Sequence, residues 1–275
     1  MTQSGTGERM EFATGSGITW SAKAVDLDSG QVLFEQGEHL ALDTASIGKV
    51  FLLHALLELE QRGELRLDEP VTRRPSEWMD NSGLWYLLQA DTLSIYDLCA
   101  LIGAVSDNAA TNTMCRRVGL DAVHASTAAL GYTDSSLDDI VRWPIPTGFP
   151  PNLSTGSARE LTDFVARVAK NEVLTEAGCD TLRRWLGAGM DCSMVASAWG
   201  LDPLAHYFYD RDIWMWNKTG TTSRVRGDVG VAMSPKRRVA YSVLANWERG
   251  SDHRDEALAT MREAGDVIRD HLLHG

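Results

Sequence analysis

Chemistry-bearing side chains gather in three short motifs that lie far apart along the chain. These motifs are Ser46-Ile47-Gly48-Lys49, Ser106-Asp107-Asn108 and Lys218-Thr219-Gly220. A serine hydroxyl is a weak nucleophile until a base removes its proton. A lysine can be that base when burial or a second cation lowers its pKa. The three motifs therefore predict acyl transfer through a serine, provided that the fold brings them into one cleft.

The first motif falls at the start of a predicted helix over 44–62, which Asp43 or Thr44 can cap and which Gly63 follows. Ser46 and Lys49 are three positions apart, so their side chains share one face of that helix. Ser46 would lie in the first turn, where the helix dipole favours a developing anion. The centre of the helix, VFLLHALL, is apolar almost all round, and such a helix belongs in the interior.

The other predicted elements run in the order strands, helices, strands, helix. Strands are expected over 18–26 and 31–35, helices over 94–105, 109–117, 121–130, 157–170 and 175–188, strands over 213–218, 227–234 and 239–247, and a last helix over 254–273. A loop with four prolines fills 142–153. This order predicts an α+β fold in which both ends of the chain form one antiparallel sheet and a helical unit is inserted between them.

Composition excludes several classes of function. The 275 residues carry a net charge of −12 and a pI near 5, which argues against nucleic-acid partners and anionic membrane surfaces. The four cysteines form no CxxC pair and no HExxH is present, so we expect no metal and no cofactor. The first 17 residues lack the apolar stretch of a secretory signal, and we expect a cytoplasmic monomer.

The three motifs together resemble the signature of serine acyl-transfer enzymes that act on penicillins. A chance Ser-Asp-Asn is expected in about 3% of chains of this length, and a chance Lys-Thr-Gly in about 6%. Ser46 and Ser106 are 60 residues apart, and the second motif continues as SDNAATN. From residue 18 to its C-terminus the chain resembles class A β-lactamases of the penicillin-recognising serine enzyme superfamily.

The resemblance implies a β-lactamase/transpeptidase-like fold and assigns four catalytic roles. Residues 1–43 and 190–275 would form an α/β domain, residues 44–189 a helical domain, and the active site would lie in the cleft between them. Ser46 would be the nucleophile and Lys49 its base. Ser106 would relay a proton to the leaving nitrogen, and Lys218 would act electrostatically and bind a substrate carboxylate.

The resemblance also implies a set of substrate-binding groups. Backbone N–H groups of Ser46 and Thr221 would form the oxyanion hole. Asn108 would hold a substrate amide, and Gly220 would offer backbone groups. Thr219 and Arg226 would join Lys218 around a carboxylate. Family members often place an aromatic pocket wall about twenty residues before the second motif, where this chain has Trp85 and Tyr86.

One segment departs from the family pattern. Class A enzymes carry Glu-x-x-Leu-Asn in a loop after the second motif, and its Glu activates the water that hydrolyses the acyl-enzyme. The Glu position falls near Val141, and no Glu or Asn occurs from Asp138 to Pro151. Asp138 or Asp139 could substitute, Lys49 or Ser106 could activate water, or an acceptor other than water could take the acyl group.

The main functional prediction is therefore a serine hydrolase that opens an amide, lactam or ester bond in a small molecule, one that carries a carboxylate. An acyltransferase or cyclising enzyme would use the same acyl-Ser46. A binding protein that kept the fold and lost turnover is the alternative from another class, and the intact set of two serines and two lysines argues against it.

Overall fold

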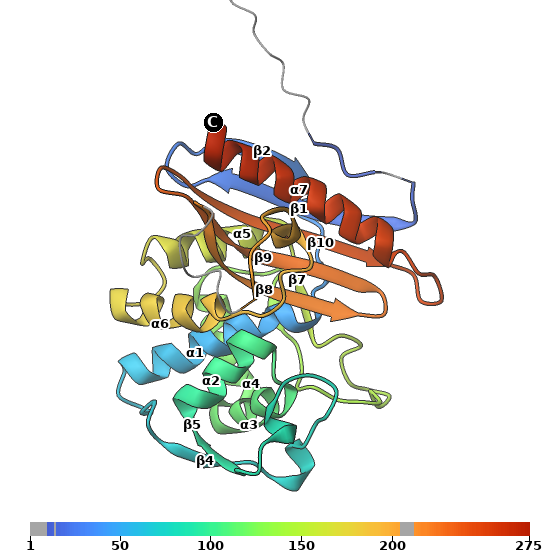
Figure 1. Ribbon diagram of the computed structural model, residues 1–275. Coiled ribbons are helices and arrows are strands. Elements are labelled where there is room, and N and C mark those ends of the chain that lie inside the picture. Colours follow the sequence, from blue (N-terminus) through green and yellow to red (C-terminus); the bar gives the residue numbers. More distant parts are fainter. Residues whose placement is uncertain (1–9, 14, 204–211) are drawn as a thin grey trace, which may run out of the picture.

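A five-stranded antiparallel sheet joins segments from early and late in the sequence (Figure 1). The computed structural model describes residues 10–13, 15–203 and 212–275. Residues 1–9, 14 and 204–211, all in the predicted α/β domain, lie outside the described part. The strand order is β2-β1-β10-β9-β8. The strands are β1 (Ile18–Asp26), β2 (Val32–Gln36), β8 (Trp214–Thr222), β9 (Val225–Met233) and β10 (Arg238–Trp247).

The sheet is covered on both faces because its side chains alternate between two hydrophobic cores. On β10, Ala240 and Leu244 pack toward the helical block, whereas Tyr241 and Val243 pack on the opposite face. That opposite face is covered by α7 (Arg254–His274). Strands buried on both faces become almost continuously apolar, as the sequence of β10 shows.

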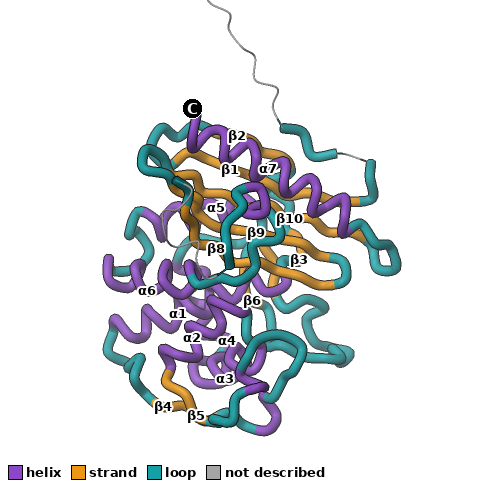
Figure 2. Tube along the Cα trace, in the orientation of Figure 1, coloured by secondary structure: helices purple, strands orange, loops and turns teal. Residues whose placement is uncertain are grey.

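The helices between β2 and β8 form a block beneath the sheet (Figure 2). They are α1 (Lys49–Gln61), α2 (Ile95–Val105), α3 (Asn108–Val118), α4 (Leu120–Ala129), α5 (Ala158–Ala169) and α6 (Glu176–Gly187). Every residue of α1 from Lys49 to Leu57 is buried, as its apolar sequence predicts. Helix α5 lies directly against β1, β9 and β10.

Two small sheets complete the architecture. One has the order β3-β7-β6 and is built from β3 (Leu42–Asp43), β6 (Ser136–Leu137) and β7 (Ser154–Gly156). The other pairs β4 (Pro70–Thr72) with β5 (Thr92–Ser94). None of the described helices has an apolar stretch long enough to span a bilayer.

The predicted α+β class and the antiparallel sheet with inserted helices are confirmed. The predicted helix over 44–62 is wrong at its start, because a 3₁₀ turn over Ala45–Gly48 precedes α1. The division into 1–43 with 190–275 and 44–189 stays a prediction.

Candidate active site

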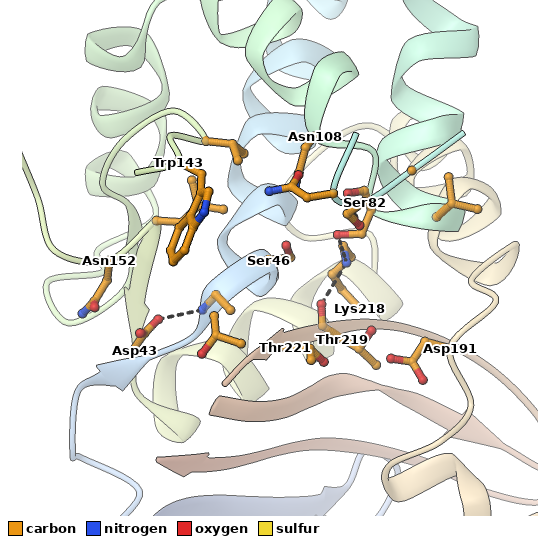
Figure 3. Close-up of a pocket in the computed structure, with 18 of the residues that line it drawn as sticks. Asp43, Ser46, Ser82, Asn108, Trp143, Asn152, Asp191, Lys218, Thr219 and Thr221 are labelled. Atoms are coloured by element: carbon orange, nitrogen blue, oxygen red, sulfur yellow. Dashed lines mark hydrogen bonds between the residues drawn. The ribbon is translucent and has the colours of Figure 1, made fainter. Parts of the chain in front are cut away.

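A cavity of about 1050 Å³ opens where the outermost strand β8 faces the turn before α1. Figure 3 shows Ser46 between Asn108 on the helical side and Lys218 and Thr219 on the strand side. The predicted site residues that line this pocket are Ser46, Ser106, Asn108, Lys218, Thr219 and Thr221. Lys49, Gly220 and Arg226 do not line it. No three His, Cys, Asp or Glu side chains among the described residues gather as metal ligands would.

Ser46 lies in a strained turn. The preceding residue, Ala45, has a φ of +50°, a left-handed conformation that costs a residue with a Cβ about 1 kcal/mol or more. From position 44 to position 57, Ser46 is the only residue that is not buried. Ser46 is therefore the most accessible residue of this segment, and it lines the pocket together with Ala45.

Ser154 holds this turn in place from β7. Its buried hydroxyl lies 2.6 Å from Thr44 Oγ1, donates to the carbonyl of Ala45 at 2.5 Å and accepts from the N–H of Gly48 at 3.3 Å. A Cβ on Gly48 would lie 2.3 Å from the Ser154 Cβ. The glycine of the first motif is thus required by the close approach of β7.

Gly220 has the same kind of role on the other side of the turn. A Cβ at this position would lie 2.1 Å from the carbonyl oxygen of Thr44. Only a glycine lets β8 approach the Ser46 turn so closely. The third motif therefore contributes close contact at Gly220, while Thr219 and Thr221 on either side line the pocket.

Lys49 is fully buried behind the pocket wall. Its Nζ donates to the carbonyl of Ser106 at 2.7 Å, to Asn108 Oδ1 at 2.7 Å and to Ser106 Oγ at 3.2 Å. Burial and the nearby charge of Lys218 lower the pKa of Lys49 well below its ordinary value, and Asp107 opposes this. A lowered pKa makes it easier for a lysine to lose its proton and so to act as a base.

Ser106 ends α2 in a left-handed conformation with a φ of +56°. The next residue, Asp107, holds this corner through its buried carboxylate, which accepts from the N–H groups of Leu84, Trp85 and Ala110 at 2.7 to 2.9 Å. Asn108 then begins α3, and its Nδ2 donates to Asn81 Oδ1 at 2.7 Å. The second motif is thus a rigid corner that aims Ser106 and Asn108 at Lys49.

Lys218 approaches the same hydroxyl from the sheet. Its Nζ donates to Ser106 Oγ at 3.0 Å and to the carbonyl of Thr219 at 2.9 Å. Burial lowers the pKa of Lys218 to about 8, while the carboxylates of Asp191 and Asp228 work in the opposite direction. The Ser106 hydroxyl therefore lies between two buried amines, one from the helical block and one from the sheet.

Arg226 does not reach the pocket. Its Nη1 donates to the carbonyls of Thr222 and Val225, both at 2.7 Å. The arginines that line the pocket near β8 are Arg224 and Arg249. A substrate-binding role for Arg226 stays a prediction, and it requires the side chain to leave these two carbonyls.

The loop that replaces the Glu-x-x-Leu-Asn segment has no unpaired carboxylate near Ser46 among the described residues. Asp138 accepts from the hydroxyls of Ser136 and Thr155. Asp139 lines the pocket, but Arg142 holds it with contacts of 2.7 and 3.1 Å. Both carboxylates thus have partners, and an aspartate in place of the usual Glu would have to give them up.

Val141 lies in the pocket wall, at the position where the sequence resemblance predicts the Glu of class A enzymes. Asn112 holds its backbone on both sides, since Oδ1 accepts from the Val141 N–H at 2.8 Å and Nδ2 donates to its carbonyl at 3.0 Å. The Val141 side chain lines the pocket. These two hydrogen bonds therefore hold the backbone of Val141, whose apolar side chain cannot act as a base.

The predicted aromatic wall at Trp85 and Tyr86 is wrong. Trp85 is fully buried, its Nε1 donates to the carbonyl of Ala90, and neither residue lines the pocket. Trp85 packs in the hydrophobic core, and the carboxylate of Asp107 binds its backbone N–H. Among the described residues, the aromatic side chain that lines the pocket is Trp143, from the proline-rich loop (Figure 3).

Several site residues were not predicted from the sequence. Asp43 lines the pocket, accepts from the Ala45 N–H at 3.0 Å and pairs with Arg224, which also donates to Asn152. Asp191 lines the opposite end beside Lys218. The fold brings Arg224 to Asp43 and Lys218 to Asp191 from distant parts of the chain, so no local pattern could have identified these two carboxylates as pocket residues.

Comparison with known structures shows the same fold in several bacterial proteins. A β-lactamase from Sphaerobacter thermophilus superposes with a TM-score of 0.78 at 24% identity, covering 93% of this chain and 91% of that one. PBP-A gives 0.79 at 19% identity, covering 93% and 90%. A β-lactamase from Burkholderia vietnamiensis gives 0.79 at 21% identity, covering 94% and 93%.

The comparison with curated proteins gave no match. The comparison with protein families did, and over almost the whole chain. Because the sequence model of the β-lactamase enzyme family matches residues 8–272, this chain belongs to that family.

Proposed function

We propose that the protein is a serine acyl hydrolase that opens a lactam, amide or ester bond through an acyl-enzyme on Ser46. The observation that carries this proposal is the pair of buried amines, Lys49 and Lys218, that both donate to the Ser106 hydroxyl. Two buried cations so close together are costly unless one of them gives up its proton. The arrangement supplies a neutral lysine beside a nucleophile and a charged lysine beside a substrate anion.

In the proposed acylation, neutral Lys49 takes the proton of Ser46 Oγ while that oxygen attacks the substrate carbonyl carbon. Backbone N–H groups of Ser46 and Thr221 hold the oxyanion. The carbon–nitrogen bond then breaks, and the Ser106 hydroxyl gives its proton to the leaving nitrogen. Ser106 regains a proton from the lysines bound to it, so the charge balances at every stage.

The substrate anion is proposed to lie at the β8 end of the pocket. Lys218 and Thr219 are the groups placed for a carboxylate, and Thr221 follows them along the strand. Asn108 faces the pocket from the helical side and would hold an amide of the acyl part. These assignments require no metal and no cofactor.

Deacylation is the step that this pocket supports least. Val141 replaces the usual Glu, and both Asp138 and Asp139 are held by other groups. Without a general base the loss in rate is about 10²- to 10⁴-fold. We therefore propose slow hydrolysis, with water activated by Lys49 or Ser106.

The same observation favours a second candidate function. An acyl-enzyme protected from water can pass its acyl group to an amine or a thiol, so an acyltransferase or cyclising enzyme would use this pocket equally well. Product analysis with added amine and thiol acceptors separates the two functions. A hydrolase gives the acid regardless of the acceptor, whereas a transferase gives an acceptor adduct.

The first test is a time course of intact-protein mass with benzylpenicillin. A mutant of the structural neighbour PBP-A forms an acyl-enzyme with penicillin G, which makes this compound a suitable first donor. We expect an adduct on the wild-type protein that clears slowly, and none on Ser46→Ala. Ser223→Ala removes another pocket hydroxyl and should keep the adduct. Undiminished labelling of Ser46→Ala would exclude Ser46 as the nucleophile.

A further inference from the structure

Trp143 is the most exposed large apolar side chain among the described residues, with 78% of its surface accessible. It packs in neither hydrophobic core, yet it lines the pocket. Figure 3 shows its indole on one side of the pocket and Lys218 on the other, with Ser46 between them. An apolar ring left in water beside a nucleophile indicates a binding role rather than a role in packing.

The loop that carries Trp143 is anchored at its base. Arg142 pairs with Asp139 through contacts of 2.7 and 3.1 Å, and its guanidinium stacks 4.2 Å from the ring centre of Phe149. Pro144 and Pro146 follow the indole and restrict the backbone. The ring is therefore presented from a restrained support, which lowers the entropy lost when a ligand packs against it.

Apolar neighbours extend this surface. Ile145 is 41% exposed and lines the pocket, as do Val141 and Leu153. No carboxylate among the described residues of this end is free, because Asp139 pairs with Arg142 and Asp43 pairs with Arg224. The Trp143 end of the pocket thus presents an exposed apolar surface beside paired charges, whereas the opposite end holds Lys218 and Asp191.

We propose that Trp143, with Ile145, forms a platform for the acyl part of the substrate and selects donors whose acyl group is aromatic or otherwise large and apolar. This inference rests on the proposed function, which places the substrate anion at Lys218 and the reacting carbonyl at Ser46. The remaining end of the pocket then receives the acyl group. Offset stacking on the indole adds to the burial of apolar surface there.

Binding to Ser46→Ala protein tests the platform without requiring any reaction. Calorimetry compares benzylpenicillin with its acetamido analogue, in which a methyl group replaces the benzyl group of the acyl part. We expect tighter binding of benzylpenicillin by Ser46→Ala, and loss of about tenfold of that preference in Ser46→Ala/Trp143→Ala. Ser46→Ala/Trp78→Ala is the matched control, since Trp78 is 47% exposed and does not line the pocket.

Three outcomes would overturn the platform: equal binding of both compounds, an unchanged preference after Trp143→Ala, or no binding of either compound. The proposed function is tested separately, by adduct formation on the wild-type protein, which retains Ser46. A Trp143-dependent preference without any adduct would support the platform and contradict the acyl-enzyme. An adduct without a Trp143-dependent preference would support the acyl-enzyme and contradict the platform.

Discussion

At the scale of single residues, the candidate site contains two buried lysines whose pKa values are both lowered. Among the described residues no carboxylate lies within hydrogen-bonding distance of Lys49 Nζ, and burial and the charge of Lys218 hold the pKa of Lys49 well below its ordinary value. Burial lowers the pKa of Lys218 to about 8. In the proposed function the two lysines differ in role, since Lys49 acts as the base and Lys218 carries the charge that attracts the substrate anion.

The pH dependence of acylation follows from this difference. Below about pH 8 Lys218 is charged and attracts the substrate carboxylate; above that pH it loses its proton and the attraction. We expect the second-order rate constant for acylation by benzylpenicillin to fall above about pH 8, by up to about tenfold per pH unit. Stopped-flow measurements between pH 6 and pH 10 test this, and the methyl ester of the same penicillin should show a shallower fall. A rate that stays flat to pH 10 would contradict the role of Lys218.

Ser154 provides a second prediction at this scale. Its hydroxyl contacts Thr44, Ala45 and Gly48, so Ser154→Ala leaves buried polar groups without partners beside a strained residue. We expect a loss of about 1–3 kcal/mol in the free energy of unfolding by urea, together with slower acylation. Ser223→Ala, an exposed serine in the same pocket, should change the free energy of unfolding by less than about 0.5 kcal/mol. Equal stability of the two variants would exclude a structural role for Ser154.

At the scale of elements, the loop between β6 and β7 is the part of the pocket on which the proposed deacylation depends. Its backbone is fixed at Val141 by Asn112, and its carboxylates are paired elsewhere. Since Asn112 already holds the backbone of Val141 in the pocket wall, a single substitution at this position can introduce a carboxylate without a change in the path of the loop.

Val141→Glu tests that view. The new carboxylate would project from the pocket wall where the family has its general base, so we expect the acyl-enzyme to clear at least about tenfold faster. The lifetime of the benzylpenicillin adduct, followed by intact-protein mass, gives the rate. Val141→Gln has almost the same shape without the base and should leave the lifetime near that of the wild type. An equal acceleration by Gln would show that shape alone matters.

Prediction from the sequence succeeded for helices and strands with a strong hydrophobic periodicity. It failed where contacts between residues distant in sequence determine the local structure. Helices α2 to α7 and the five long strands lie within a few residues of their predicted bounds, because each has an apolar face that it must bury. The turn before α1 is not α-helical because its contacts are with residues distant in sequence. Ser154 donates to the carbonyl of Ala45, and Gly220 of β8 packs against the carbonyl of Thr44. Strands of two or three residues, such as β3 and β6, are too short to show an alternation of apolar and polar residues.

The candidate site shows the same division. The motifs identified five residues that line the pocket, since each motif is local, and the family resemblance added Thr221. The burial of Trp85 could not be read locally, because Trp85 packs in a hydrophobic core built from residues distant in sequence. Trp143 was not predicted as a pocket residue. The positions of Arg224 and Arg226 likewise depend on the turn between β8 and β9, where Arg226 binds the carbonyl of Thr222.

At the scale of the whole molecule, a buried polar network ties the sheet to the segment before it. Asp228 on β9 is fully buried and accepts from Asn217 Nδ2 at 2.9 Å, the Val195 N–H at 3.1 Å and the Tyr241 hydroxyl at 3.2 Å. Burial raises the pKa of Asp228 to about 7, although the bond from Asn217 opposes this. The network thus carries a titratable group in the centre of the fold.

This network predicts how stability varies with pH. A carboxyl whose pKa is raised on folding binds more protons in the folded state than in the unfolded state, so its contribution to stability falls as pH rises from about 4 to about 7. The slope is at most about 1.4 kcal/mol per pH unit for one group. Urea unfolding of the wild type and Asp228→Asn across this range should show a slope that the variant lacks. Parallel curves for the two proteins would exclude Asp228 as its source.

The pairing of β1 with β10 also bears on how the protein is made. Ile18 lies opposite Trp247, so β1 finds its neighbour in the sheet only after β10 has been synthesised. The Ser46 turn depends on β8 in the same way, because Gly220 packs against it. Contacts so distant in sequence form slowly and leave apolar strands open to aggregation in the meantime. We therefore expect the sheet and the Ser46 turn to form only after β8, β9 and β10 have been synthesised.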